Sequence, residues 1–308
     1  MQSGNEEKIV LDVTSDMEDE RIDKVLSAYM DTLSRSFLQK LLKEGSVFAD
    51  GKSVKANYKV REGQRIEFMI PAAVEPDIVP EDIPLSVLYE DADVLVVDKP
   101  KGMVVHPAAG HYSKTLVNAV MFHCGDSLSG INGVLRPGIV HRIDMDTTGS
   151  IIICKNDHAH NEIAKQLKQH SIRRKYRAIV CGVIKEEEGT VDAPLGRDRK
   201  DRKKMAIVPD GKHAVTHYRV LERFREHTYV ECVLETGRTH QIRVHMASKG
   251  YPLLGDAVYG RAKDKYKCQG QCLHAMTLGF EHPVTLKYTE VEAPLPEYFE
   301  HLLRILPK

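Results

Sequence analysis

The sequence predicts an α+β protein with a mixed, largely antiparallel sheet, preceded by a small N-terminal αα–β unit. Strand-like segments outnumber helical ones in the second part of the chain, and several follow one another directly, which disfavours regular βαβ winding. A cluster of prolines separates this part from two short amphipathic helices and a hairpin. With 308 residues, 42% of them hydrophobic, the chain is long enough for two domains.

Composition favours a soluble cytoplasmic protein. The 44 Lys and Arg balance the 44 Asp and Glu, so the formal net charge is zero and predicts nothing about nucleic acid. The longest apolar runs are about five residues, too short to span a membrane, and the polar start of the chain has no signal-peptide pattern. The six cysteines are scattered, which is typical of a reducing compartment.

Positive charge is concentrated in two segments. Residues 21–65 hold ten Lys or Arg and five Asp or Glu, a local balance of 10 − 5 = +5. Residues 197–204 hold six cations and two carboxylates. Such patches can follow a phosphate backbone, although a short charge run is more often a solvated loop.

The N-terminal elements follow from periodicity and turn residues. Apolar residues recur at three- and four-residue spacing in 21–26 and 33–42, which predicts two amphipathic helices, the second with Ser34 as N-cap. Asp50-Gly51 between apolar residues predicts a hairpin. Four prolines between 71 and 84 predict a stiff extended linker.

The larger second part is expected to alternate strands and helices irregularly. Strands are predicted over 94–98, 104–107, 175–183, 214–221 and 228–235, and helices over 115–124, 158–170 and 239–248. The expected organisation in chain order is a leader (1–16), an αα–β domain (17–70), a linker (71–84) and the larger domain (85–308).

The densest group of reactive side chains lies in 138–149, Gly-Ile-Val-His-Arg-Ile-Asp-Met-Asp-Thr-Thr-Gly, directly before a buried apolar run. A polar loop mounted on a buried strand is where a rigid scaffold usually holds functional groups. Asp144 follows the cation Arg142 and precedes a Thr-Thr-Gly turn, a setting that favours an ionised carboxylate. Asp144 is therefore the first candidate for a catalytic group.

This segment resembles the signature of the RluA/RluD-type pseudouridine synthases, His-Arg-Leu-Asp followed by Thr-(Thr/Ser)-Gly. Ile143 replaces the usual Leu, and Met145 stands where Lys is common. The resemblance implies that Asp144 is the catalytic nucleophile. It also implies that the second part of the chain folds as the family's catalytic domain.

A second signature, Gly-Arg-Thr-His-Gln-Ile-Arg-x-His, is matched at 237–245. Alone, Arg243 could be a surface arginine, but the resemblance implies that it pairs with Asp144, which would fix the charge and rotamer of that carboxylate. Further matches at 252–260, including Gly-Asp-x-x-Tyr-Gly, and at 273–296 extend the resemblance over about 85–296.

The resemblance implies functional roles for Tyr176 and Arg142 as well. Tyr176 could be an ordinary half-buried strand residue, whereas the family's Lys-x-Tyr strand places it against the target base. Arg142 would fill the space that the extruded base leaves in the RNA, since flipping costs on the order of a few kcal/mol. Its alternatives are a phosphate contact or an ion pair with Asp146, which itself is expected to support the Thr-Thr turn.

Residues of about 20–70 resemble the alpha-L RNA-binding domain through the Ser-Arg-Ser-x-x-Gln helix, the Gly-x-Val strand and the Asp-Gly turn. The resemblance implies that Arg35, Gln39 and Lys40 face structured RNA. A solvated helix face is the alternative.

Taken together, the resemblance implies an RNA pseudouridine synthase that needs no metal or other cofactor. Its expected partner is large-subunit (23S) ribosomal RNA or its precursor, with transfer RNA as the alternative. Asp144 would either attack ribose C1′ or assist elimination at the sugar, and the sequence leaves both routes open.

Two other classes are less consistent with the sequence. A zinc nucleobase deaminase needs Pro-Cys-x-x-Cys, which the chain lacks; Cys268, Cys272 and His274 have only loose ligand spacing and are interpreted as core or loop residues. An inert RNA-binding assembly factor would be favoured by substitution at Asp144, Tyr176 or Arg243, and all three are intact.

Overall fold

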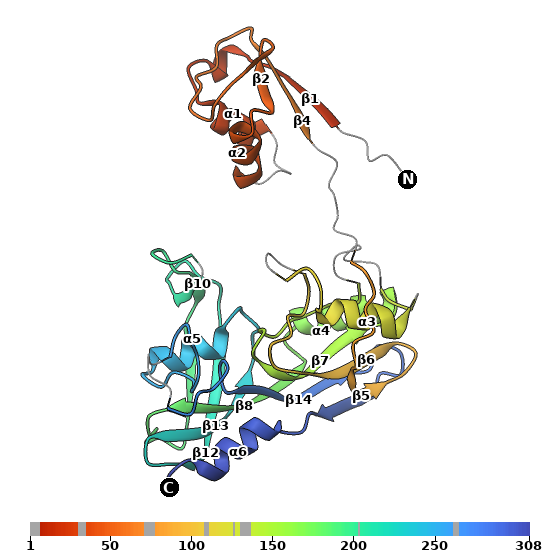
Figure 1. Cartoon of the computed structure of the whole chain (residues 1–308), viewed down its shortest axis with the longest axis vertical. Coiled ribbons are helices and arrows are strands. Elements are labelled where there is room, and N and C mark those ends of the chain that lie inside the picture. The colour runs from red at the N-terminus through yellow and green to blue at the C-terminus, as the bar shows by residue number, and fades with distance from the viewer. Residues whose placement is uncertain are drawn as a thin grey trace. The chain divides into compact units, whose positions relative to one another are not determined.

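The computed structural model describes residues 7–29, 35–70, 78–107, 111–125, 127–129, 137–202, 204–260 and 265–308. Two compact units, Met1–Pro76 and Asp77–Lys308, make up the chain, and each is described by itself (Figure 1). The first unit contains β1 (Glu7–Asp12), a 3-10 turn (Ser15–Met17), α1 (Ile22–Tyr29), α2 (Arg35–Lys43), β2 (Val47–Ala49), β3 (Lys52–Ser53) and β4 (Arg65–Ile70).

The second unit contains more strands than the sequence predicts. In chain order its elements are β5 (Ser86–Glu90), β6 (Val94–Lys99), α3 (Leu116–Cys124), β7 (Thr148–Cys154), α4 (Asp157–Lys168), β8 (Arg173–Cys181), β9 (Glu188–Asp192), β10 (Leu195–Arg197), β11 (Met205–Ile207), β12 (Val215–Arg223), β13 (His227–Leu234), α5 (Gln241–Ser248), β14 (Leu273–Glu281), β15 (Tyr288–Glu292) and α6 (Glu297–Ile305).

In the first unit, four strands form an antiparallel sheet in the order β1-β4-β2-β3. Residues 7–12, within the expected leader of 1–16, form β1 and pair with β4. Asp50 and Gly51 connect β2 and β3 with φ of +46° and +76°, which confirms the hairpin prediction. The apolar faces of α1 and α2 share one core with the sheet, including Ile22, Leu26, Leu38, Ile66 and Phe68. Ser34, the expected N-cap of α2, lies outside the described residues.

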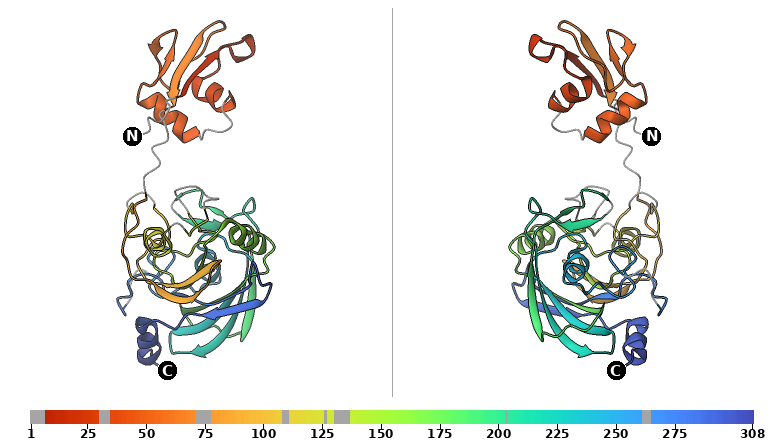
Figure 2. Two further views of the ribbon diagram at one scale, coloured as in Figure 1. Left: turned by 90° about the vertical axis from the view of Figure 1, so that its right-hand side faces the viewer. Right: turned by 90° about the vertical axis from the view of Figure 1, so that its left-hand side faces the viewer.

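Nine strands form the main sheet of the second unit, in the order β5-β6-β7-β14-β8-β13-β12-β9 with β15 also paired to β14. Among the described strands, only β7 and β14 run parallel. The α+β class and the mixed, largely antiparallel sheet are therefore confirmed. Figure 2 shows how strongly this sheet curves.

Helices cover both faces of this sheet because side chains alternate along each strand. On β8, Ala178 and Val180 pack in one core with α5, whereas Ile179 and Cys181 pack in another with α6. Figure 1 shows α5 and α6 on opposite sides of the sheet. The same alternation along β6 places α3 and α4 on opposite faces.

The strand expected over 104–107 and the expected start of the helix at Thr239 are both wrong. The strand expected over 104–107 is a loop, because the carbonyl oxygens of Val104 and Val105 accept the N–H groups that begin α3 rather than pairing with a strand. The helix expected from Thr239 begins at Gln241, because His240 has a left-handed φ of +56°. The terminal helix α6 is absent from the expected elements, although its buried residues Phe299 and Leu302 recur at helical spacing.

Part of the proline-rich stretch packs against the second unit. Residues 71–77 lie outside the described part of the chain. From Ile78, which is buried, the chain is extended along α3. The side-chain amide of Asn118 donates to the carbonyl of Val79, and the N–H of Glu81 donates to the carbonyl of Asn118.

No helix in the described residues has the length and apolar character needed to cross a bilayer.

Candidate active site

Asp144 lies in the loop that enters β7, beside the parallel pairing of β7 with β14. The N–H of Thr147 donates to the carbonyl of Asp144 at 3.0 Å, and the Thr147 hydroxyl accepts from Nε2 of Gln271 at 3.1 Å. Gly149 has a φ of +109°, and a Cβ there would collide with the backbone of Ala275. The Thr-Thr-Gly motif therefore fixes this loop against β14.

Arg243, in the second motif, connects Asp144 to another carboxylate. Its Nη1 donates to Asp144 at 2.9 Å, while Nε and Nη2 donate to the two oxygens of Asp256 at 2.7 and 2.9 Å. Asp256 is fully buried and also accepts the N–H groups of Val258 and Tyr259. Burial disfavours both charges, but the pairing outweighs it, so the pKa of Arg243 is raised and that of Asp256 is lowered.

His240 faces Asp144 from another side. Its Nδ1 lies 2.8 Å from the hydroxyl oxygen of Tyr259, which accepts the N–H of Met205 at 2.8 Å. The other ring nitrogen, Nε2, lies 3.9 Å from an oxygen of Asp144. Burial lowers the pKa of His240 despite the charge of Asp144, so the ring is favoured in its neutral form.

A hollow open to solvent lies beside Asp144. Its wall includes Arg142, Tyr176, Leu234, His240 and Arg243. Tyr176 is only 8% exposed, and burial raises the pKa of its phenol, so the hydroxyl remains protonated. The hollow thus combines a held carboxylate with an aromatic wall and a neutral phenol.

Lys99, at the end of β6, binds the backbone of the loop that contains Asp144. Its Nζ donates at 2.8–2.9 Å to three backbone carbonyl oxygens, those of Pro100, Met103 and Met145. Burial lowers the pKa of Lys99 to about 7, whereas neighbouring carboxylates favour its charged form. Because three acceptors match the three protons of an ammonium group, Lys99 fixes the backbone next to Asp144.

Arg142 is exposed and borders three adjoining hollows. Within the described part of the chain it forms no ion pair, so the alternative pairing with Asp146 is not present. The site therefore brings Asp144, Tyr176, Arg243 and Arg142 together around one hollow.

In the first unit, Gln39 is exposed on α2 and borders a hollow of about 640 Å³. Three cations share this hollow: Arg21, Lys43 and Lys55. The side chains of Arg35 and Lys40, predicted to face RNA with Gln39, lie outside the described part of the structure.

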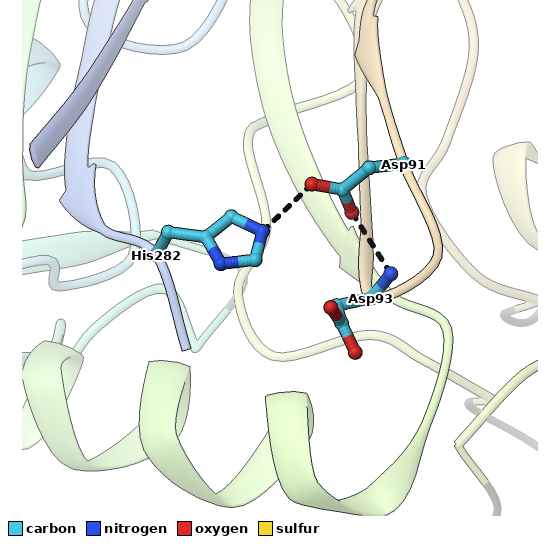
Figure 3. A group of neighbouring side chains, drawn as sticks. All are labelled: Asp91, Asp93 and His282. Carbon is cyan, nitrogen blue, oxygen red and sulfur yellow. Dashed lines mark hydrogen bonds and ion pairs between the residues drawn. The ribbon is translucent and has the colours of Figure 1, made fainter. Parts of the chain in front are cut away.

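A separate group of Asp91, Asp93 and His282 brings three potential metal-binding atoms within 4.8 Å (Figure 3). Asp91 accepts from the Tyr89 hydroxyl, from two backbone N–H groups and from Nε2 of His282 at 2.7 Å. Burial opposes the charge, but these hydrogen bonds lower the pKa of Asp91 to about 2. The other ring nitrogen of His282 accepts two backbone N–H groups. The hydrogen bond between Asp91 and His282 therefore joins the β5–β6 turn to the β14–β15 turn.

His274 likewise has both ring nitrogens engaged, with the Thr148 hydroxyl at 2.8 Å and the Ala293 carbonyl at 3.1 Å. The Cys268 and Cys272 sulfurs lie 3.8 Å apart. These contacts are those of core residues, as the sequence suggests.

Comparison with known proteins identifies the family. Residues 93–248 match the model for RNA pseudouridylate synthase, and residues 20–66 match the S4 domain. The chain is 53% identical over 300 residues to an uncharacterized RNA pseudouridine synthase, YlyB, of Bacillus subtilis, covering 97% of this chain and 98% of the relative. The chain belongs to the RNA pseudouridylate synthase family.

The synthase also resembles ribosomal large subunit pseudouridine synthase D of Zymomonas mobilis, with 47% identity over 305 residues and 96% of each chain covered. The solved structure of human RNA pseudouridylate synthase domain containing 1 covers 74% of this chain and 98% of its own, with a TM-score of 0.59 and 23% identity. It shares the fold. The family assignment makes this protein an isomerase that forms pseudouridine in RNA.

Sequence reasoning assigns no role to Lys99, Asp256 or Tyr259, which hold the site in place. The signal for Asp256 and Tyr259 is the Gly-Asp-x-x-Tyr-Gly match, whose two polar side chains both serve the second motif. The signal for Lys99 is a lysine at the end of an otherwise apolar strand. Such a residue is rarely fully buried unless its charge is compensated.

Proposed function

We propose that this synthase isomerises specific uridines in large-subunit ribosomal RNA, with Asp144 as the nucleophile. The observation that carries the chemistry is the 2.9 Å ion pair between Asp144 and Arg243 at a hollow walled by Tyr176. Two relatives named ribosomal large subunit pseudouridine synthase D, from Zymomonas mobilis and Pseudomonas aeruginosa, are 47% and 44% identical to it and support the RNA class.

The reaction breaks the bond from ribose C1′ to uracil N1, turns the base and joins C1′ to C5. The base takes a proton at N1 and loses one from C5. Asp144 acts at C1′, either by attacking it or by assisting elimination at the sugar. Arg243 orients the carboxylate, and the Tyr176 ring stacks on the base while its phenol takes part in proton transfer. One closed pocket keeps the detached base in position for its return.

Access to the uridine requires the base to leave the RNA stack. Arg142 lies exposed at the rim, where a guanidinium plane can stack on neighbouring bases and balance phosphate charge. The S4 unit binds structured RNA through Arg35, Gln39 and Lys40. The partner is the large-subunit RNA or its precursor, and the enzyme acts in the cytoplasm.

Mapping pseudouridines in ribosomal and transfer RNA, from cells with and without this protein, tests the proposal. We expect a small set of sites to vanish from large-subunit RNA and to return with the wild-type protein but not with Asp144→Asn. Loss of pseudouridine from transfer RNA alone would show that the substrate is transfer RNA and not large-subunit RNA. Unchanged modification in every RNA would reject the proposed activity and favour an inert RNA-binding protein.

A further inference from the structure

A second hollow, of about 860 Å³, adjoins the Asp144 pocket. The two hollows share Arg142, Tyr176, Leu234 and Arg238. The second also includes His141, His170, Arg174 and Gly237. Among the described residues that line it there are three arginines and no carboxylate, and we call it the arginine basin.

The arginines of the basin differ from Arg177 and Arg243 of the same unit. Arg243 is paired with two carboxylates, and Arg177 is paired with Glu231. In contrast, no ion pair within the described ranges includes Arg142, Arg174 or Arg238. The basin therefore has an excess of positive charge that the protein itself does not neutralise.

Arg174 is the most enclosed of the three, with 7% of its surface exposed. Its Nη2 donates to the carbonyl of Glu235 at 3.0 Å, but its buried Nε has no acceptor among the described residues. Burial lowers the pKa of Arg174, yet a guanidinium remains charged in a protein. A buried charge without a partner is unfavourable, so an anion in the basin would stabilise this arrangement.

Gly237 provides the room for this side chain. A Cβ at Gly237 would lie too close to Nη1 of Arg174, so a larger residue at this position would displace the end of the Arg174 side chain. The next residue is also fixed, because the N–H of Arg238 donates to the side chain of Gln241 at 2.9 Å. The Arg174 guanidinium thus packs directly against the backbone at Gly237.

We propose that the arginine basin binds a phosphodiester of the RNA backbone, directly next to the flipped uridine. This inference rests on the proposed function, since it assigns the phosphate to the strand whose base contacts Tyr176. The planar fork of an arginine matches phosphate oxygens, and three such groups line this one hollow. Because Arg142 and Tyr176 border both hollows, the phosphate lies within one nucleotide of the base.

The test neutralises one phosphate at a time. A synthetic stem-loop containing a uridine that the wild-type enzyme modifies is prepared with a single methylphosphonate on either side of that uridine. We expect one of the two substitutions to lower kcat/KM of the wild type roughly 10- to 100-fold. The same methylphosphonate should change kcat/KM of the Arg174→Gln variant less than about threefold, because the variant already lacks the contact that the methylphosphonate removes. Arg174→Lys should be intermediate.

Arg173→Gln is the matched control. Arg173 is adjacent on β8, is exposed and lies 3.4 Å from Glu290. This variant should respond to the methylphosphonates as the wild type does. Gly237→Ala, which retains all three arginines but crowds Arg174, should respond as Arg174→Gln does, and it replaces that variant if Arg174→Gln fails to fold by circular dichroism.

The outcomes separate the basin from the proposed function. If the wild type modifies the stem-loop but the losses from methylphosphonate and from Arg174→Gln multiply independently, the basin inference is wrong and the function stands. If the wild type modifies no uridine in any RNA, both fail. Inorganic phosphate at constant ionic strength should compete only weakly. Strong competition without a methylphosphonate effect would assign the basin to a free anion and overturn the backbone contact.

Discussion

Arg243 and Asp256 form a bidentate ion pair in which two guanidinium nitrogens donate to the two carboxylate oxygens at 2.7 and 2.9 Å. The remaining nitrogen of Arg243 donates to Asp144. The position of Asp144 therefore depends on a carboxylate that does not line the hollow. Asp256 is accordingly a positioning residue rather than one that touches substrate.

Asp256→Asn keeps the shape of this side chain and removes its charge. We expect kcat to fall about 10- to 100-fold with KM changed little, because Arg243 loses its orientation while RNA contacts remain. Breaking a buried pair should also lower the free energy of unfolding by about 3 kcal/mol. Steady-state kinetics and urea unfolding check both effects.

Asp210→Asn is the control, because Asp210 is exposed and pairs with Arg199 at the surface. It should leave both activity and stability unchanged. Wild-type kcat in Asp256→Asn would show that Arg243 does not need its second partner.

The sequence predicts which residues carry the chemistry better than it predicts what supports them. The resemblance to the synthase signatures selects Asp144, Tyr176 and Arg243, and the structure places all three at one hollow, although their roles stay predictions. Apolar periodicity predicts strands but not their neighbours in the sheet. The parallel pairing of β7 with β14 and the burial of Lys99 both depend on that order. Asp256 is missed because its partner Arg243 lies on a separate element.

Asp144→Asn is expected to abolish pseudouridine formation, with kcat lower by at least about 10⁴-fold, the scale typical of a lost nucleophile. Fold and RNA affinity should remain, since Asp144 is at the surface of the hollow and Arg243 keeps Asp256. Quantifying pseudouridine in modified RNA and measuring affinity by fluorescence anisotropy check this result. Near-normal turnover would contradict the assignment.

Lys99→Met leaves three carbonyl oxygens without their donor and should lower the free energy of unfolding by about 2–4 kcal/mol. The folded pKa of Lys99, about 7, lies below its ordinary value of 10.5. Between these values the unfolded chain binds more protons, so wild-type stability should rise with pH relative to Lys99→Met. Below pH 7 Lys99 is protonated in both the folded and the unfolded state, so the difference in free energy of unfolding between wild type and Lys99→Met is constant.

Urea unfolding at several pH values from 6 to 10 measures this difference. Lys165→Met is the control, because Lys165 is exposed on α4 beside Glu162. It should follow the wild type at every pH. If the free energies of unfolding of wild type and Lys99→Met differ by the same amount at every pH in this range, Lys99 stays charged throughout.

Chelators should leave turnover unchanged on a short stem-loop. His274 and His282 have both ring nitrogens engaged by protein groups, and Asp91 already accepts four hydrogen bonds. Assays with EDTA and with a zinc-specific chelator check this expectation. Inhibition that added zinc reverses would mean that one of these groups binds metal.

Charge in the S4 unit should set affinity for large RNA without affecting the chemical step. Lys43 and Lys55 are exposed around the hollow that also includes Gln39 and Arg21. Replacing both lysines with Gln should weaken binding to large-subunit RNA and reduce its salt dependence, because fewer phosphates are neutralised. Lys8→Gln is the control, since Lys8 is paired with Glu67 at 3.1 Å.

Deleting residues 1–76 should have the same effect in a stronger form. Residues 21–65 supply a balance of 10 − 5 = +5, and joining two weak RNA sites raises affinity through effective concentration. The remaining residues, 77–308, retain the hollow and every residue proposed for the reaction. They should still modify a short stem-loop at high concentration. Equal binding of both forms across a salt titration, or a folded truncation that is inactive on every RNA, would contradict a targeting role for the S4 unit.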